Sequence, residues 1–130
     1  MTFDPSMAVL VVDDVATMSR IIQTLLKQIG LTNIEYARDG KSALNALKKK
    51  AFSVVISDWN MNPMDGLVLL EHVRRDPTLK NVRFILISAE ANADFVSSAL
   101  DERRERFLTK PFSAGVLKQT IEELFRSSET

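Results

Sequence analysis

Short, almost wholly apolar runs alternate along the chain with longer segments whose apolar residues recur every three or four positions. The apolar runs cover residues 8–12, 54–57, 84–87 and 107–109, and a mixed run covers residues 34–37. Short apolar runs are typical of strands, whereas three- and four-residue spacing is typical of amphipathic helices. Strands that alternate with helices predict five βα units, and therefore a parallel sheet with helices on both faces.

Five segments carry the helical spacing. Their apolar positions are Met18, Ile21, Ile22, Leu25 and Ile29; Ala43, Leu44 and Leu47; Leu67, Leu70 and Val73; Phe95, Val96, Ala99 and Leu100; and Val116, Leu117, Thr120, Ile121 and Leu124. Gly30 is expected to end the first helix in a left-handed conformation. The third helix is expected to stop before Pro77, because proline disfavours helical geometry at the preceding residue.

The polarity of the strands predicts their order. The first, third and fourth runs are nearly all apolar and suit the centre of a sheet, whereas the mixed second run and the short fifth run suit its edges. The predicted fold is α/β: a doubly wound five-stranded parallel sheet of order 2-1-3-4-5, which is the flavodoxin-like order. In such sheets ligands bind at the switch point between the first and third strands.

Composition narrows the function. The 130 residues suit one domain, expected to span residues 1–130 with its core at 7–125 and no output domain. The chain has equal numbers of basic and acidic residues, 17 each, so it has no net positive charge that would attract DNA or a membrane surface. The chain has no cysteine and no apolar run near the roughly 20 residues of a membrane span. We therefore expect a cytoplasmic protein that binds no DNA and inserts into no membrane.

Reactive side chains follow four of the predicted strands. Asp13 and Asp14 follow the first, Asp58 the third, Ser88 the fourth and Lys110 the fifth. Adjacent strands lie about 4.8 Å apart, so these groups are expected to converge at one sheet edge. Three close carboxylates repel one another unless a cation lies among them, and an all-oxygen donor set favours Mg²⁺. Asp58 could then act as a nucleophile toward a phosphoryl group.

Each of these residues also has an ordinary explanation. Asp14 could cap the first helix and Ser88 the fourth, and Lys110 could be a surface lysine. The coincidence of suitable groups at four strand ends favours the phosphoryl site. A flavin protein would need a Ser/Thr/Gly-rich phosphate loop where the acidic pair stands.

With these residues the sequence resembles the receiver domain of two-component response regulators, and single-domain CheY-like proteins most of all. The matching pieces are Val11-Val12-Asp13-Asp14, Ser57-Asp58-Trp59-Asn60-Met61, Met64-Asp65-Gly66, Ser88-Ala89-Glu90 and Lys110-Pro111-Phe112. The resemblance implies a phospho-acceptor that only phosphorylates and dephosphorylates itself, and not a classical enzyme.

The resemblance also implies roles for individual residues. Asp58 would accept phosphate from a histidine kinase. Asp14, Asp58 and the backbone carbonyl of Asn60 would bind Mg²⁺, with Asp13 acting through water. Ser88 and Lys110 would contact the phosphoryl group.

Two further features follow from the resemblance. The peptide between Lys110 and Pro111 would be cis. Phe107 stands where the family often has a switch tyrosine, so a rotamer switch coupled to Ser88 is expected alongside ordinary core packing. The loop after the acceptor departs from the family pattern, because Pro63 stands one place late.

A second departure precedes the last strand, where residues 101–106 read Asp-Glu-Arg-Arg-Glu-Arg without the usual glycine. One interpretation, which we favour, is a longer fourth helix with salt bridges from Asp101 to Arg104 and from Glu102 to Arg106. The other is an arginine cluster of Arg103, Arg104 and Arg106 that binds cyclic di-GMP, as in the arginine-rich Cle subclass.

Three functions remain open at this point. The first is a stand-alone phosphorylation switch, whose fourth helix, last strand and last helix form the face that binds a protein target, plausibly in chemotaxis and at the flagellar motor. The second is a phosphorelay carrier or phosphate sink. The third is a cyclic di-GMP-responsive regulator that uses the arginines.

Overall fold

The computed structural model describes residues 3–89, 100–101 and 103–127 of the chain. Its five strands are β1 (Val9–Val12), β2 (Ile34–Ala37), β3 (Val54–Asp58), β4 (Arg83–Ser88) and β5 (Glu105–Thr109). They form one parallel sheet of order β2-β1-β3-β4-β5. The predicted fold class and strand order are therefore confirmed.

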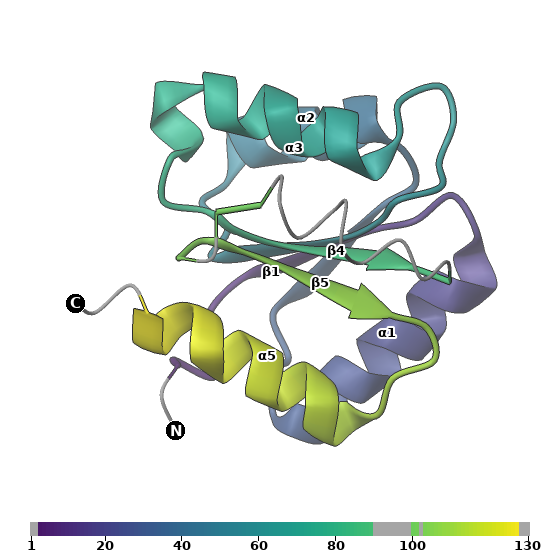
Figure 1. Ribbon diagram of the computed structural model, residues 1–130, viewed down its shortest axis with the longest axis vertical. Coiled ribbons are helices and arrows are strands. Elements are labelled where there is room, and N and C mark those ends of the chain that lie inside the picture. The colour runs from purple at the N-terminus through teal and green to yellow at the C-terminus, as the bar shows by residue number, and fades with distance from the viewer. Residues whose placement is uncertain (1–2, 90–99, 102, 128–130) are drawn as a thin grey trace.

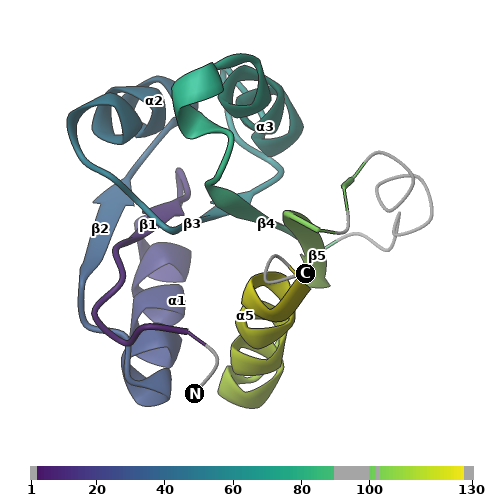
Figure 2. The same cartoon turned by 90° about the vertical axis from the view of Figure 1, so that its left-hand side faces the viewer.

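Helices cover both faces of this sheet. They are α1 (Ala16–Ile29), α2 (Gly40–Lys49), α3 (Gly66–Arg75), the 3-10 turn η1 (Pro77–Leu79) and α5 (Ala114–Ser127). α2 and α3 lie on one face, and α1 and α5 lie on the other (Figures 1 and 2). The predicted fourth helix over Phe95, Val96 and Ala99 lies outside the described residues. Within the described part, no helix is long and apolar enough to cross a membrane.

Alternating strand side chains build two cores. Val9 and Val11 pack toward α1 and α5, whereas Leu10 and Val12 pack toward α2 and α3. All four are fully buried, as expected for a central strand covered on both faces. This packing holds the carboxyl ends of β1, β3 and β4 in line, and the predicted site lies at those ends.

The helix ends follow local rules. Gly30 has a φ of 107°, and its N–H donates to Lys27 O, so the predicted left-handed end of α1 is confirmed. α3 ends at Arg75, two residues before Pro77, also as predicted. Ile21, which we placed on the apolar face of α1, is instead 48% exposed.

The expected helix over residues 101–106 is wrong, although the ion pair predicted with it, between Asp101 and Arg104, is present at 3.2 Å. Residues 103–104 form a turn, and β5 begins at Glu105, two residues earlier than predicted. Glu105 is only 5% exposed, and its carboxylate pairs with Arg74 of α3. A carboxylate in the core needs its cation, so this tertiary contact overrides the helical charge spacing.

Candidate functional site

Three carboxylates meet at the carboxyl ends of β1 and β3. Asp13 and Asp14 follow β1, and Asp58 is the last residue of β3, the parallel neighbour of β1. One oxygen from each carboxylate lies within 4.8 Å of the others. Asp13 is fully buried and Asp58 nearly so, whereas Asp14 is exposed. The sheet thus brings together the three acidic residues that the sequence singled out.

Asp13 is the most constrained of the three. Its Oδ1 accepts the N–H of Val15 at 2.8 Å, whereas its Oδ2 is buried without a hydrogen-bond partner. Burial raises the pKa of Asp13, and the nearby carboxylates of Asp58 and Asp14 raise it further, against the Val15 N–H and Lys110. A buried oxygen without a partner costs free energy that a bound cation would recover.

This donor set fits Mg²⁺. All three side chains offer oxygen, and the described residues place neither histidine nor cysteine among them.

The suggestion that Asp14 caps the first helix is wrong, because Val15 is the N-cap of α1 and no side chain caps it.

Lys110 supplies the positive charge of the site. Its Nζ lies 3.1 Å from Asp58 Oδ1, and both side chains are mostly buried. The backbone N–H of Lys110 donates to Ser88 O at 2.9 Å, which ties the end of β5 to the end of β4. The peptide between Lys110 and Pro111 is cis, as the resemblance implied.

Ser88 ends β4, one residue beyond Ile87, which pairs with Asp58 in the sheet. It is 1% exposed. Its buried position beside the end of β3 is suited to contact with a group carried on that aspartate. Contact of Ser88 with the phosphoryl group stays a prediction.

The loop after Asp58 folds tightly around Trp59. The carbonyl of Trp59 accepts the N–H of Met61 at 3.1 Å and of Gly66 at 2.9 Å. Asn60 lies within this loop and is exposed. A Cβ on Gly66 would stand 2.4 Å from the carbonyl oxygen of Asp58, so the close approach of α3 to the acceptor requires glycine here. Pro63, which stands one place later than in the family pattern, is joined to Asn62 by a cis peptide.

Phe107 packs edge-on against Trp59, with ring centroids 6.4 Å apart and an interplanar angle of 88°. It is half-buried at the core beneath α2 and α3. The ordinary packing role is therefore present in the structure. Coupling of this ring to Ser88 stays a prediction.

Sequence reasoning missed one residue that contacts the site. The hydroxyl of Tyr36, on the edge strand β2, donates to the backbone carbonyl of Asp13 at 2.8 Å. Burial raises the pKa of Tyr36, and the Asp13 carboxylate adds to this, so the hydroxyl stays a donor at neutral pH. No motif marks this tyrosine, and only the register that pairs it with Val11 reveals the contact.

Each of the three arginines has acceptors close to it. Arg104 pairs with Asp101 at 3.2 Å and donates to Lys80 O at 3.0 Å. Arg103 is 3.5 Å from the same aspartate, and Arg106 lies 3.9 Å from Glu123 of α5. Each guanidinium thus serves an acid or a carbonyl of its own surroundings. The predicted partner of Arg106, Glu102, lies outside the described residues.

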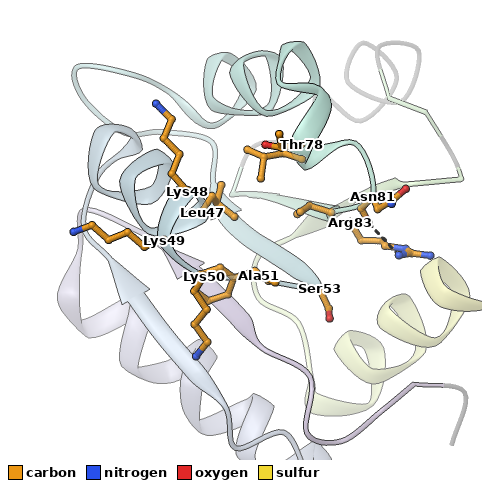
Figure 3. A pocket seen from close by; sticks show the side chains of 12 residues that line it. Leu47, Lys48, Lys49, Lys50, Ala51, Ser53, Thr78, Asn81 and Arg83 are labelled. Atoms are coloured by element: carbon orange, nitrogen blue, oxygen red, sulfur yellow. Dashed lines mark hydrogen bonds between the residues drawn. The ribbon is translucent and has the colours of Figure 1, made fainter.

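A cavity of about 570 Å³ lies at the opposite end of the sheet, between the end of α2 and the start of β4. Three consecutive lysines line it, but Lys48, Lys49 and Lys50 point in different directions (Figure 3). Lys50 is paired with Glu35 at 2.6 Å, and the Arg83 guanidinium lies 4.5 Å from the ring centroid of Phe125. The cations of this cavity therefore do not converge on a common ligand.

Comparison with known proteins agrees with the site. Residues 9–122 match the family model of the response regulator receiver domain. The chain is 42% identical to the chemotaxis protein CheY of Pseudomonas aeruginosa over 119 residues, 92% of this chain and 96% of that protein. It is 39% identical to the chemotaxis protein CheY-3 of Vibrio cholerae over 120 residues, 92% of each chain.

The structural comparison gives the same result. The solved structure of Vibrio cholerae CheY4 superimposes with a TM-score of 0.80 at 28% identity, covering 92% of this chain and 98% of that one. None of these matches supports the arginine-rich, cyclic di-GMP-binding subclass. A nucleotide site at Arg103, Arg104 and Arg106 therefore stays a prediction that these matches do not support.

Proposed function

The chain belongs to the response regulator receiver family, and we propose that Asp58 accepts a phosphoryl group from a histidine kinase in a Mg²⁺-dependent transfer. The observation that carries this proposal is the pairing of Asp58 with Lys110 at 3.1 Å, beside the buried Asp13 and the exposed Asp14. A receiver is a phospho-acceptor, so the only catalysis we propose is the transfer to its own aspartate and the later hydrolysis.

In the proposed transfer, a carboxylate oxygen of Asp58 attacks the phosphorus of a phosphohistidine. The phosphorus–nitrogen bond breaks as the acyl phosphate forms, and the released imidazole keeps the electron pair and takes up a proton. Lys110 neutralises charge that develops on the equatorial oxygens. Ser88 donates a hydrogen bond to one of these oxygens once the group is attached.

The acidic residues prepare the site for the metal. We propose that Asp14, Asp58 and the backbone carbonyl of Asn60 hold Mg²⁺, with Asp13 acting through water. Bound Mg²⁺ would neutralise phosphoryl charge and bring the phosphorus within reach of the carboxylate. The partnerless Oδ2 of Asp13 supports this, because a metal-bound water would supply its missing hydrogen bond.

The output we propose is chemotaxis signalling. The two relatives at 39% and 42% identity are chemotaxis proteins, and the match covers 92% of this chain. Phosphorylation would shift the population of states around Ser88 and Phe107 and so change the affinity of the face that includes β5 and α5 for a protein target. We propose a component of the flagellar motor as the target.

The acceptor is tested by exposing the protein to acetyl phosphate with Mg²⁺ and measuring intact mass. The parent protein should gain one phosphoryl group, and Asp58→Asn should gain none. Asp39→Asn is the matched control, because Asp39 caps α2 outside the site and asparagine caps a helix as well. If Asp58→Asn is labelled as much as the parent protein, Asp58 is not the acceptor. If the parent protein is not labelled with Mg²⁺ present and no chelator, the proposed transfer is refuted.

The output is tested by a binding assay between the phosphorylated protein and a purified flagellar motor switch protein. We expect the affinity to rise on phosphorylation and to stay low for Asp58→Asn. An unchanged affinity, together with rapid loss of phosphate, would contradict the motor role and favour a phosphate sink.

A further inference from the structure

Tyr36 connects the edge of the sheet to the acidic loop. Its hydroxyl donates to the main-chain carbonyl of Asp13 at 2.8 Å, across 23 positions of sequence. The same strand also accepts the N–H of Asp13 at Ala37 O, at 3.1 Å. β2 therefore holds both polar groups of the Asp13 backbone, one through the main chain and one through a side chain.

The carbonyl of Asp13 shares a planar peptide with the N–H of Asp14. Because a peptide unit turns as one body, a hydrogen bond to the carbonyl restrains the direction in which Asp14 leaves the strand. Asp14 needs such a restraint. Its carboxylate is exposed, and it makes no side-chain hydrogen bond or ion pair with the described residues.

The Tyr36 ring contributes little else. Its side chain is 42% exposed, and it belongs to neither hydrophobic core. Burying an aromatic ring therefore does not account for this residue, and the hydroxyl makes its specific contact. Hydrogen bonds from outside the coordination sphere orient the ligands of a metal.

We propose that Tyr36 is a positioning residue of the Mg²⁺ site, which fixes the Asp13–Asp14 peptide so that the Asp14 carboxylate faces the metal position. This inference rests on the proposed function. Without the hydroxyl, water can satisfy the Asp13 carbonyl and the peptide can rotate. Metal binding must then order the loop, which weakens the affinity without changing the ligands.

The test is Tyr36→Phe, which removes only the hydroxyl. A Mg²⁺ titration followed by the fluorescence of Trp59, next to Asp58, gives the dissociation constant. Losing one neutral hydrogen bond should weaken Mg²⁺ binding roughly two- to tenfold. The melting temperature in EDTA should stay that of the parent. Glu35→Gln is the matched control, because Glu35 lies on the same strand but pairs with Lys50.

A second readout separates positioning from a structural role. The rate of labelling by acetyl phosphate should fall in Tyr36→Phe at low Mg²⁺ and return to the parent rate at saturating Mg²⁺. Equal Mg²⁺ affinities of parent and Tyr36→Phe would overturn the inference and leave the proposed function intact. A fall in metal-free stability that matches the loss of affinity would also overturn it. A parent protein that binds no Mg²⁺ would refute the proposed function and the inference with it.

Discussion

Glu105 and Arg74 form a buried ion pair that joins β5 to α3. The Glu105 side chain is 5% exposed and that of Arg74 17%. The other carboxylate oxygen of Glu105 accepts the N–H of Asp101 at 2.7 Å, and Arg74 otherwise has a long 3.5 Å hydrogen bond to Leu79 O. Replacing Glu105 with alanine would leave a guanidinium and a backbone N–H without their acceptor in a nearly dry site.

Breaking a buried ion pair by removing one partner typically costs about 3–5 kcal/mol. We expect Glu105→Ala to lose this much of the free energy of unfolding. A domain of 130 residues has an unfolding entropy near its melting point of about 270 cal/mol/K, so the melting temperature should fall by roughly 11–18 °C. Urea unfolding followed by the fluorescence of Trp59 gives the free energy directly.

Glu123→Ala is the control for this loss. Glu123 faces Arg106 at 3.9 Å, but its side chain is 42% exposed, so the control should lose less than about 1 kcal/mol. The double variant Arg74→Met/Glu105→Leu should be more stable than Glu105→Ala, because it leaves no unpaired charge. If Glu105→Ala is as stable as Glu123→Ala, the Glu105–Arg74 pair does not stabilise the packing of β5 against α3.

Three further predictions test local features. Gly66→Ala places a Cβ 2.4 Å from Asp58 O and 2.6 Å from Leu86 Cδ1. The variant should lose about 1–3 kcal/mol of the free energy of unfolding and should be labelled more slowly by acetyl phosphate. An unchanged labelling rate would contradict the close packing of α3 against Asp58. Gly30→Ala should lose roughly 1–2 kcal/mol of the free energy of unfolding in urea, because a φ of 107° strains an alanine. No atom lies within 4 Å of the added Cβ, so a clash would not contribute. Gly115→Ala should be nearly neutral, and equal losses in the two variants would exclude backbone strain as the cause. Burial raises the pKa of Asp13, so ionising it as the pH rises removes stability from the metal-free protein, whereas Mg²⁺ binds the ionised form. The rise in melting temperature caused by Mg²⁺ should therefore grow as the pH increases from the ordinary aspartate pKa of 3.8 toward neutrality, and a rise independent of pH would show that Asp13 takes no part.

Much of the fold could be predicted because its signals are local. The apolar run before Asp13 and the one before Asp58 mark central strands, since strands covered on both faces cannot carry alternating polar residues. Gly30 marks a helix end, since only glycine adopts its φ without strain. Once a parallel sheet is inferred, the residues that follow its strands must meet at one edge, which is why the acidic cluster could be anticipated.

Other features depend on residues that no local pattern connects. Spacing alone suggested a helix over residues 101–106, but Glu105 enters the core because Arg74, 31 positions away, supplies its counter-charge there. The partner of Lys110, the partnerless Oδ2 of Asp13 and the hydroxyl of Tyr36 likewise become visible only when the strands are in register. Periodicity and turn chemistry act within a few residues and can be read along the chain, whereas ion pairs, burial and hydrogen bonds between strands depend on distances that only the packed sheet sets.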